Sequence, residues 1–185
     1  MKLKNLMELA RTRIYSDEDV SYQDLSDIIS SVADDYGFVQ KCYLDEISTG
    51  GIFGETYDCL QLIHPEHEYD YYNYYITLTR QGNMLLVVIY AGGTSKQLKK
   101  EDFAQNTRVF DGTASRGVAA GLFSGGAVGA GLAIGSLAGG AIKGGIKAIA
   151  KGINALTRDP AALNRELEWY DQAMCVFSTV FASEE

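Results

Sequence analysis

The chain has 185 residues, 46% of them hydrophobic and 11% aromatic, so it is long enough to bury the core of one domain. Its formal net charge is −8, which argues against nucleic acid as a partner because phosphate binding requires a basic surface. The acidic side chains lie toward both ends, whereas residues 113–158 carry five basic side chains and no acidic one.

The first elements of the chain are predicted to be helices. Residues 2–13 indicate a short helix, and Ser21 with Asp24 forms a capping-box pattern at the start of a second one. We expect the second helix to end at Gly37. The apolar residues at helical spacing are Leu3, Leu6, Met7 and Ala10 in the first segment and Leu25, Ile28, Ile29 and Val32 in the second.

From residue 38 the hydrophobic period changes to two, which predicts β-strands. The segment Gln81-Gly82-Asn83 indicates a tight hairpin, and the uniformly apolar Leu85–Ile89 indicates a central strand. We therefore expect an α+β fold built on a four-stranded antiparallel meander with flanking helices. The four strands are expected at residues 38–47, 55–63, 71–79 and 84–90.

The sheet is expected to be followed by short elements that complete an acidic α+β domain. Thr94 and Gln97 form a second capping-box pattern before a short charged helix, and Val109–Phe110 suggests a further short strand. Because residues 1–112 contain an amphipathic helix and a central strand, we expect them to fold as a domain. Residues 113–185 are then a second, helical module.

Residues 116–151 are dominated by glycine and alanine, with no charged side chain between Arg116 and Lys143. Residues four apart share one face of a helix, so glycines at this spacing leave a groove that another backbone can approach closely. This glycine-zipper pattern predicts tight helix packing. The glycines that form it are Gly117, Gly121, Gly125 and Gly129, followed on a shifted register by Gly131, Gly135 and Gly139.

Glycine costs about 1 kcal/mol per helical position relative to alanine, so a helix of this composition requires stabilisation from its surroundings. A membrane provides it by penalising unpaired backbone groups, and a protein interior or oligomer interface provides it by close packing. The third interpretation is that residues 116–151 form a flexible linker rather than a helix. Lys143, Lys147 and Lys151 fall four apart beside this segment, and such a basic face is typical of a helix at a membrane surface or against an acidic partner.

The C-terminal region predicts an αα-hairpin. Asp159-Pro160 is a strong start signal for a helix, and two apolar stripes on the residues that follow indicate a helix buried on two sides. The preceding arm of the hairpin is expected over Ile142–Leu156, where isoleucines recur at heptad spacing. The apolar residues of the last helix are Leu163, Leu167, Tyr170, Met174, Phe177 and Phe181 on one stripe and Trp169, Ala173, Val176 and Val180 on the other.

The sequence contains a candidate binding surface, whereas its two histidines do not indicate a metal site. Four tyrosines, Tyr71, Tyr72, Tyr74 and Tyr75, occupy one predicted strand and form either a partner-binding face or part of the core. His64 and His67 make an H-x-x-H pair, but they lie in a proline turn and are the only histidines, so we expect no metal there.

No set of catalytic side chains and no cofactor motif can be assembled, so we expect a non-enzymatic protein without a cofactor. The three cysteines are too few for a disulfide framework, and charges interrupt the first apolar stretch, so we expect a cytoplasmic protein, either free or associated with a membrane. The leading hypothesis is membrane association or self-association through the glycine zipper. The alternative is a soluble assembly or binding protein that buries this segment and contacts a protein partner through its tyrosine strand.

Overall fold

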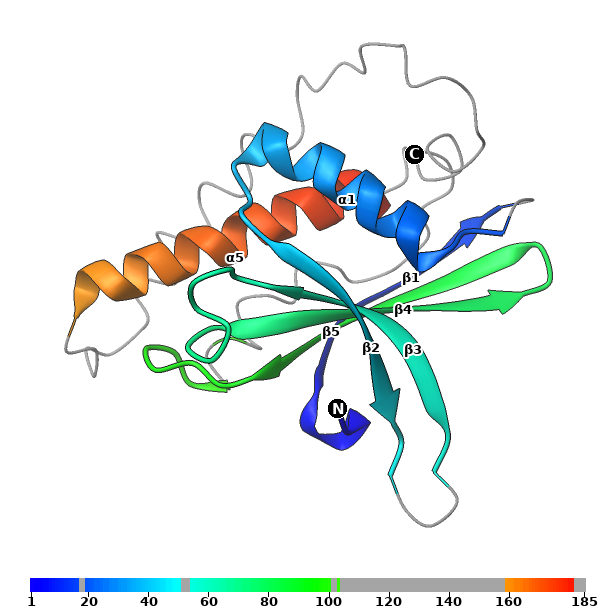
Figure 1. Cartoon of the computed structure of the whole chain (residues 1–185), viewed down its shortest axis with the longest axis horizontal. Helices are drawn as coiled ribbons and strands as arrows, with labels where there is room; N and C mark the ends of the chain where they lie inside the picture. The colour runs from blue at the N-terminus through cyan, green and yellow to red at the C-terminus, as the bar shows by residue number, and fades with distance from the viewer. Residues whose placement is uncertain (17–18, 51–53, 101–102, 104–158, 182–185) are drawn as a thin grey trace.

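The structure is a computed structural model of the whole chain, and it describes residues 1–16, 19–50, 54–100, 103 and 159–181. These residues form an open antiparallel sheet of five strands with two long helices on one face, which makes the fold α+β (Figure 1). The strands lie in the order β1-β5-β4-β3-β2. Their bounds are β1 Met7–Tyr15, β2 Lys41–Ser48, β3 Thr56–Ile63, β4 Tyr72–Gln81 and β5 Met84–Gly93.

The predicted α+β class is confirmed, and β2, β3, β4 and β5 pair antiparallel in succession, but the predicted count of four strands is not, because the sheet has five. Gly82 has a φ of 66° in the turn between β4 and β5, where its lack of a Cβ allows the left-handed conformation that a tight hairpin requires. β5 lies inside the sheet between β1 and β4, as its uniformly apolar sequence predicted. The tyrosine-rich β4 is the middle strand.

The helix predicted at residues 2–13 is wrong. A short 3-10 helix, η1 (Leu3–Asn5), is followed by β1, which pairs antiparallel with β5 and adds a fifth strand. The apolar positions fit a helical period, but β5 offers an open ladder of backbone groups, and pairing with it outweighs weak local propensity. Leu3 and Leu6 still contribute to packing, since they cover Tyr75 and its neighbours on the sheet face opposite the helices.

α1 (Tyr22–Tyr36) begins and ends as the sequence predicted. The Ser21 hydroxyl accepts a hydrogen bond from the Asp24 backbone N–H, and the Asp24 carboxylate accepts one from the Ser21 N–H, which completes the capping box. Gly37 ends the helix in the left-handed conformation, with a φ of 65°.

The short helix predicted to start at Thr94 does not begin there, since residues 94–99 are not helical. The Ser95 hydroxyl, rather than that of Thr94, accepts hydrogen bonds from the backbone N–H groups of Gln97 and Leu98. A serine side chain offers the backbone this local alternative to a helix. The strand predicted at Val109–Phe110 lies outside the described residues.

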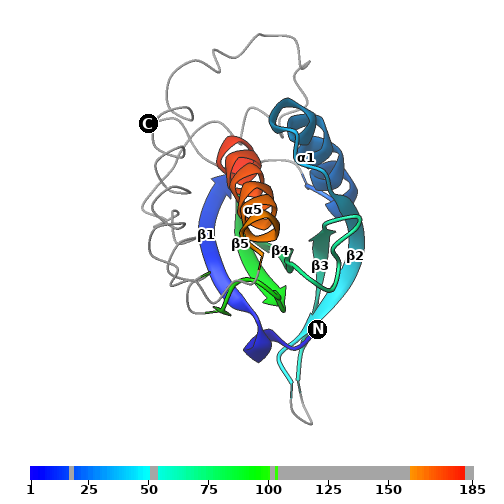
Figure 2. The same ribbon diagram turned by 90° about the vertical axis from the view of Figure 1, so that its left-hand side faces the viewer.

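α5 (Pro160–Phe181) confirms the predicted C-terminal helix. The Asp159 carboxylate accepts hydrogen bonds from the N–H groups of Ala161 and Ala162, so Asp159 caps the helix immediately before the proline. The preceding arm predicted at Ile142–Leu156 lies outside the described residues. α5 packs beside α1 and against the sheet (Figure 2).

One hydrophobic core joins α5 to the sheet and to α1. Both stripes of α5 are buried, as predicted, and they belong to one cluster of buried side chains with residues of α1 and of the sheet. The predicted boundary at residue 112 lies outside the described residues, but α5 from the proposed second module shares its core with residues 1–103. The apolar interior of the first unit is therefore completed by the end of the chain.

Candidate functional site

The predicted site residues fall in two groups. The seven zipper glycines and the basic face of Lys143, Lys147 and Lys151 lie outside the described residues, so they remain a prediction. The tyrosines of β4 and the turn before it are in the core rather than on a partner-binding surface. Their exposed fractions are 6% for Tyr71, 4% for Tyr72, 0% for Tyr74 and 2% for Tyr75.

Both faces of β4 are covered, which explains the burial of these tyrosines. Tyr74 packs on the helix side, where its ring stacks on Trp169 at 5.4 Å between centroids and meets Phe177 edge-on at 5.0 Å. Tyr75 packs on the opposite face with Ile47 and Cys59. The tyrosine strand is thus part of the core, which was the second of the two readings of its sequence.

A cluster of titratable side chains lies against the first half of α5. His64 and Tyr71 lie against the Trp169 ring, with centroid distances of 5.6 Å and 5.9 Å. His67 stacks on Tyr71 at 4.5 Å. Burial lowers the pKa of His64, and the nearby His67 acts in the same direction. His64 therefore favours its neutral form, and both imidazole rings are part of an aromatic cluster.

Glu166 is a fully buried carboxyl at the centre of this region. The Tyr170 hydroxyl donates to Glu166 Oε1 at 2.5 Å, and the Tyr72 backbone N–H donates to the Tyr170 oxygen at 2.8 Å. The second carboxyl oxygen, Oε2, has no hydrogen-bond partner in the part of the chain that the structure describes. The arrangement connects α5 to the beginning of β4 through a short polar chain.

Burial raises the pKa of Glu166 above its ordinary value of 4.5, and the charge of Asp70 acts in the same direction, against the hydroxyls of Ser95 and Tyr170. A raised pKa means that the folded state binds the proton more tightly than the unfolded state. The stabilising effect of this group is therefore complete below pH 4.5 and is lost as the pH rises through the folded pKa.

We expect Glu166→Gln to stabilise the protein relative to wild type at pH 8 and to do so less at pH 5. Glutamine keeps an acceptor for the Tyr170 hydroxyl and carries no charge to bury. Denaturant unfolding at the two pH values measures the difference. Glu166→Ala, which removes that acceptor and leaves a cavity, should destabilise at both. An identical effect of Glu166→Gln at pH 5 and pH 8 would contradict the pKa shift.

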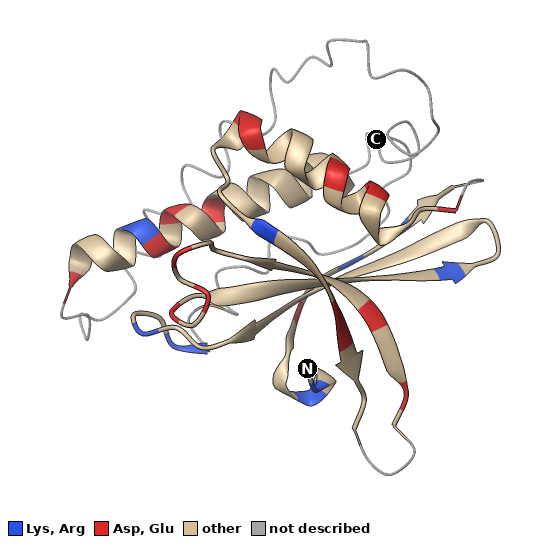
Figure 3. Cartoon of the chain, viewed as in Figure 1, with Lys and Arg blue, Asp and Glu red and all other residues tan. Residues whose placement is uncertain are grey.

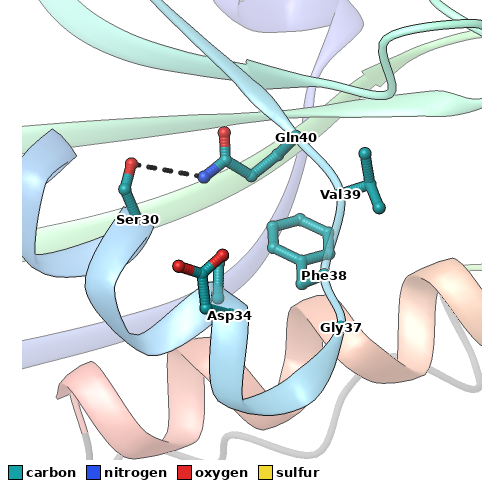
Figure 4. Close-up of a pocket in the computed structure, with 7 residues that line it drawn as sticks. Ser30, Asp34, Gly37, Phe38, Val39 and Gln40 are labelled. Atoms are coloured by element: carbon teal, nitrogen blue, oxygen red, sulfur yellow. Dashed lines mark hydrogen bonds between the residues drawn. The ribbon is translucent and has the colours of Figure 1, made fainter.

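A shallow pocket of about 330 Å³ lies where α1 ends and β2 begins (Figure 4). Its wall combines the apolar Phe38 and Val39 with polar side chains, among which Gln40 Nε2 donates to the Ser30 hydroxyl at 3.3 Å. Among the described residues that line it, Asp34 is the only titratable one. These residues therefore offer no pair of groups for acid–base or nucleophilic chemistry.

The cysteines of the sheet do not face one another. Cys42 is opposite Leu62, and Cys59 is opposite Asp45. Burial, assisted by the charge of Asp45, raises the pKa of Cys59 to about 12, so this thiol stays protonated at neutral pH. All three cysteines are free.

The described residues contain neither a cluster suited to a metal ion nor a membrane-spanning helix. Within them, no group of three or more His, Cys, Asp or Glu side chains is placed to hold a metal ion. No helix in the same part of the chain is both long enough and apolar enough to span a membrane.

The chain was compared with protein-family models, curated proteins and solved structures, and none of them matches it.

The Glu166 network was missed by reasoning from the sequence. A signal was present, since Glu166 and Tyr170 are four residues apart on a helix face that is otherwise apolar. An acidic residue inside an apolar stripe implies a buried partner. The second half of the network, the backbone N–H of Tyr72, belongs to an element far away in the sequence and carried no such signal.

Proposed function

We propose that this protein is non-enzymatic and that residues 113–158 associate with a membrane surface or with copies of themselves, carried by an acidic α+β unit. The observation that carries the proposal is the contrast between the two parts. The described residues enclose a main hydrophobic core and a smaller cluster on the other face of the sheet, whereas residues 113–158 contain every zipper glycine, the basic face and no acidic side chain.

The position of this segment in the chain supports the proposal. On its N-terminal side, Phe103 packs into the core against Tyr72 and Tyr170, with ring centroids 4.6 Å and 4.8 Å apart. Immediately after it, Asp159 caps α5, which belongs to the same core. The described residues on both sides of the segment therefore belong to a single folded unit, which is suited to present an inserted segment.

Net charge also distinguishes the acidic α+β unit from residues 113–158. Outside residues 113–158 the chain has 24 acidic and 11 basic side chains. Acidic residues lie along α1 and on the sheet (Figure 3). An acidic carrier does not itself bind anionic lipid, so an attraction to such a surface must come from the basic segment.

An enzymatic function has less support. Three side chains with shifted pKa values, Glu166, Tyr170 and His64, pack in or against the aromatic core rather than around an open cleft. The alternative of a soluble assembly protein remains, in which the glycine segment packs against copies of itself. The tyrosine strand no longer favours a heterologous partner, because its side chains are buried.

We expect the protein to float with anionic liposomes in a density gradient, and the Lys143/Lys147/Lys151→Glu variant to float at least tenfold less. Each lysine near an anionic surface contributes about 1 kcal/mol, so three reversals should abolish binding. The matched control, Lys4/Lys99/Arg165→Glu, changes the net charge equally at exposed positions elsewhere and should float like wild type.

The same flotation experiment distinguishes membrane association from self-association. Protein that stays at the bottom of the gradient under every lipid composition would remove the membrane reading. Self-association would then be tested by light scattering of Gly125→Leu, because four extra carbons cannot enter a groove that another backbone occupies. A Gly125→Leu protein with unchanged oligomer size would end the zipper hypothesis.

A further inference from the structure

The outer edge of β2 is a strand edge that the described residues leave mostly open. β2 pairs with β3 without interruption from Lys41 to Ser48. On its other side, the Ser48 N–H donates to the Met1 carbonyl at 2.8 Å, and Lys2 forms a parallel bridge with Ser48. Within the described ranges, no other segment pairs with this edge.

The direction of the free backbone groups follows from the contact at Ser48. Alternate residues of a strand point their N–H and C=O groups to the same side. Ser48 faces outward, so Leu44 and Cys42 also face outward, while Tyr43 and Asp45 direct their backbone groups toward β3. The first half of β2 thus presents a short, regular hydrogen-bonding edge.

Apolar side chains gather at this edge. Seven large apolar side chains are exposed among the described residues, and three of them lie within six positions here. Leu44 is 68% exposed, Val39 58% and Tyr43 48%. An exposed edge that combines open backbone groups with apolar side chains is a template for pairing with another strand.

We propose that two copies of the chain pair through this edge, antiparallel, about a two-fold axis that places Tyr43 opposite the partner's Tyr43. In this register the outward-facing Cys42 lies opposite the partner's Leu44, so their backbone groups can exchange hydrogen bonds. Lys41 lies opposite the partner's Asp45. Because the axis repeats each contact, the interface contains this oppositely charged pair twice.

Charge complementarity selects this register over its neighbours. Sliding the partner so that Cys42 is opposite the partner's Cys42 leaves Lys41 opposite the partner's Tyr43 and removes both ion pairs. Sliding it the other way, with Leu44 opposite the partner's Leu44, places Lys41 opposite the partner's Ile47 and again removes both ion pairs. It also extends the ladder to Ser48, whose outer edge is already bridged by Lys2. Like or unmatched charges directly opposite one another weaken a strand pair, whereas opposite charges stabilise it.

The surroundings of the two sheet edges agree with this choice. The other edge strand, β1, contains a bulge between Glu8 and Ala10 that breaks its register, a feature that discourages edge pairing. At the β2 edge, α1 places the short Ser26 and Ser30 against Cys42 and Gln40, with Asp27 also close to Cys42. Short side chains leave room for the helix of a second copy on the same face.

The first test is a charge exchange in the full chain, followed by sedimentation velocity over a range of concentrations. Lys41→Glu places two like-charged pairs in the interface and should raise the dimer dissociation constant at least tenfold. The double variant Lys41→Glu/Asp45→Lys restores opposite charges and should return the constant to within about threefold of wild type. Lys99→Glu, an exposed control with the same net charge as Lys41→Glu, should not change it.

The second test fixes the register. Residues opposite one another at a position without hydrogen bonds have Cα atoms about 4.5 Å apart, which suits a disulfide. In a Cys42→Ser background, Tyr43→Cys should therefore form a covalent dimer on mild oxidation. Glu46→Cys in the same background should not, because its partner copy lies several residues away along the strand.

The outcomes distinguish this interface from the association proposed for residues 113–158. Lys41→Glu should float with liposomes as wild type does, since it leaves the basic segment unchanged. The β2 interface would be overturned if Lys41→Glu/Asp45→Lys dimerised with the same raised dissociation constant as Lys41→Glu. Equal cross-linking of the Tyr43→Cys and Glu46→Cys variants would also overturn it. A wild-type chain that stays monomeric at every concentration would overturn it as well.

Discussion

Replacing Phe177 by alanine is expected to lower the free energy of unfolding by about 3–5 kcal/mol. Phe177 is fully buried on α5, and its ring meets the edge of Tyr74 in the middle strand at 5.0 Å between centroids. Truncation removes this contact and leaves a cavity that the stiff aromatic neighbours fill only partly. Because a domain of this size is stable by about 5–15 kcal/mol, the loss is a large fraction of the total.

Chemical denaturation followed by circular dichroism measures this effect, with Asn164→Ala as the matched control. Asn164 is exposed on the same helix, so its replacement should change the free energy of unfolding by less than about 0.5 kcal/mol. If Phe177→Ala were as mild as Asn164→Ala, α5 would not be part of the core in solution.

A fragment that ends after residue 112 is expected to be unfolded or aggregated, although the sequence led us to expect an independent domain there. Without α5, the apolar helix-side face of the sheet would be exposed to water. The buried side chains that the fragment would lose from this face are Leu163, Leu167, Trp169, Tyr170, Ala173, Val176 and Phe177.

A chain in which a flexible linker replaces residues 104–158 is expected to fold, because it keeps α5. A glycine–serine linker of about 20 residues has a root-mean-square length of roughly 22–27 Å. Phe103 lies against Tyr170, ten residues or about 15 Å of helix from Pro160, so a linker of this length can connect the two. Thermal unfolding by circular dichroism compares the two proteins. A cooperative transition in the 1–112 fragment alone, at the temperature of the linker chain, would show that α5 is dispensable for the core.

The elements that could be predicted from the sequence have local signals. The capping box at Ser21, the glycine turn at Gly82 and the Asp159-Pro160 start of α5 each depend on neighbouring residues only, and each was confirmed. The periodicity of α5 likewise predicted burial on both stripes. Local chemistry sufficed because these interactions close within one turn of chain.

The elements that could not be predicted depend on distant parts of the chain. The apolar positions of residues 2–13 match a helix as well as a strand, and only the edge of β5 decides between them. In the same way, Tyr74 and Tyr75 are buried because α5 covers one face of the sheet and η1 covers part of the other. The sequence of β4 alone does not show that α5 and η1 cover its two faces.

The described residues form a folded unit without residues 113–158, and we propose that this segment supplies the association. Flotation of the full chain and the linker chain with anionic liposomes in one gradient compares the two directly. We expect the full chain to move to the lipid fraction and the folded linker chain to stay at the bottom. A linker chain that floats as efficiently as the full chain would show that residues 113–158 do not supply the association.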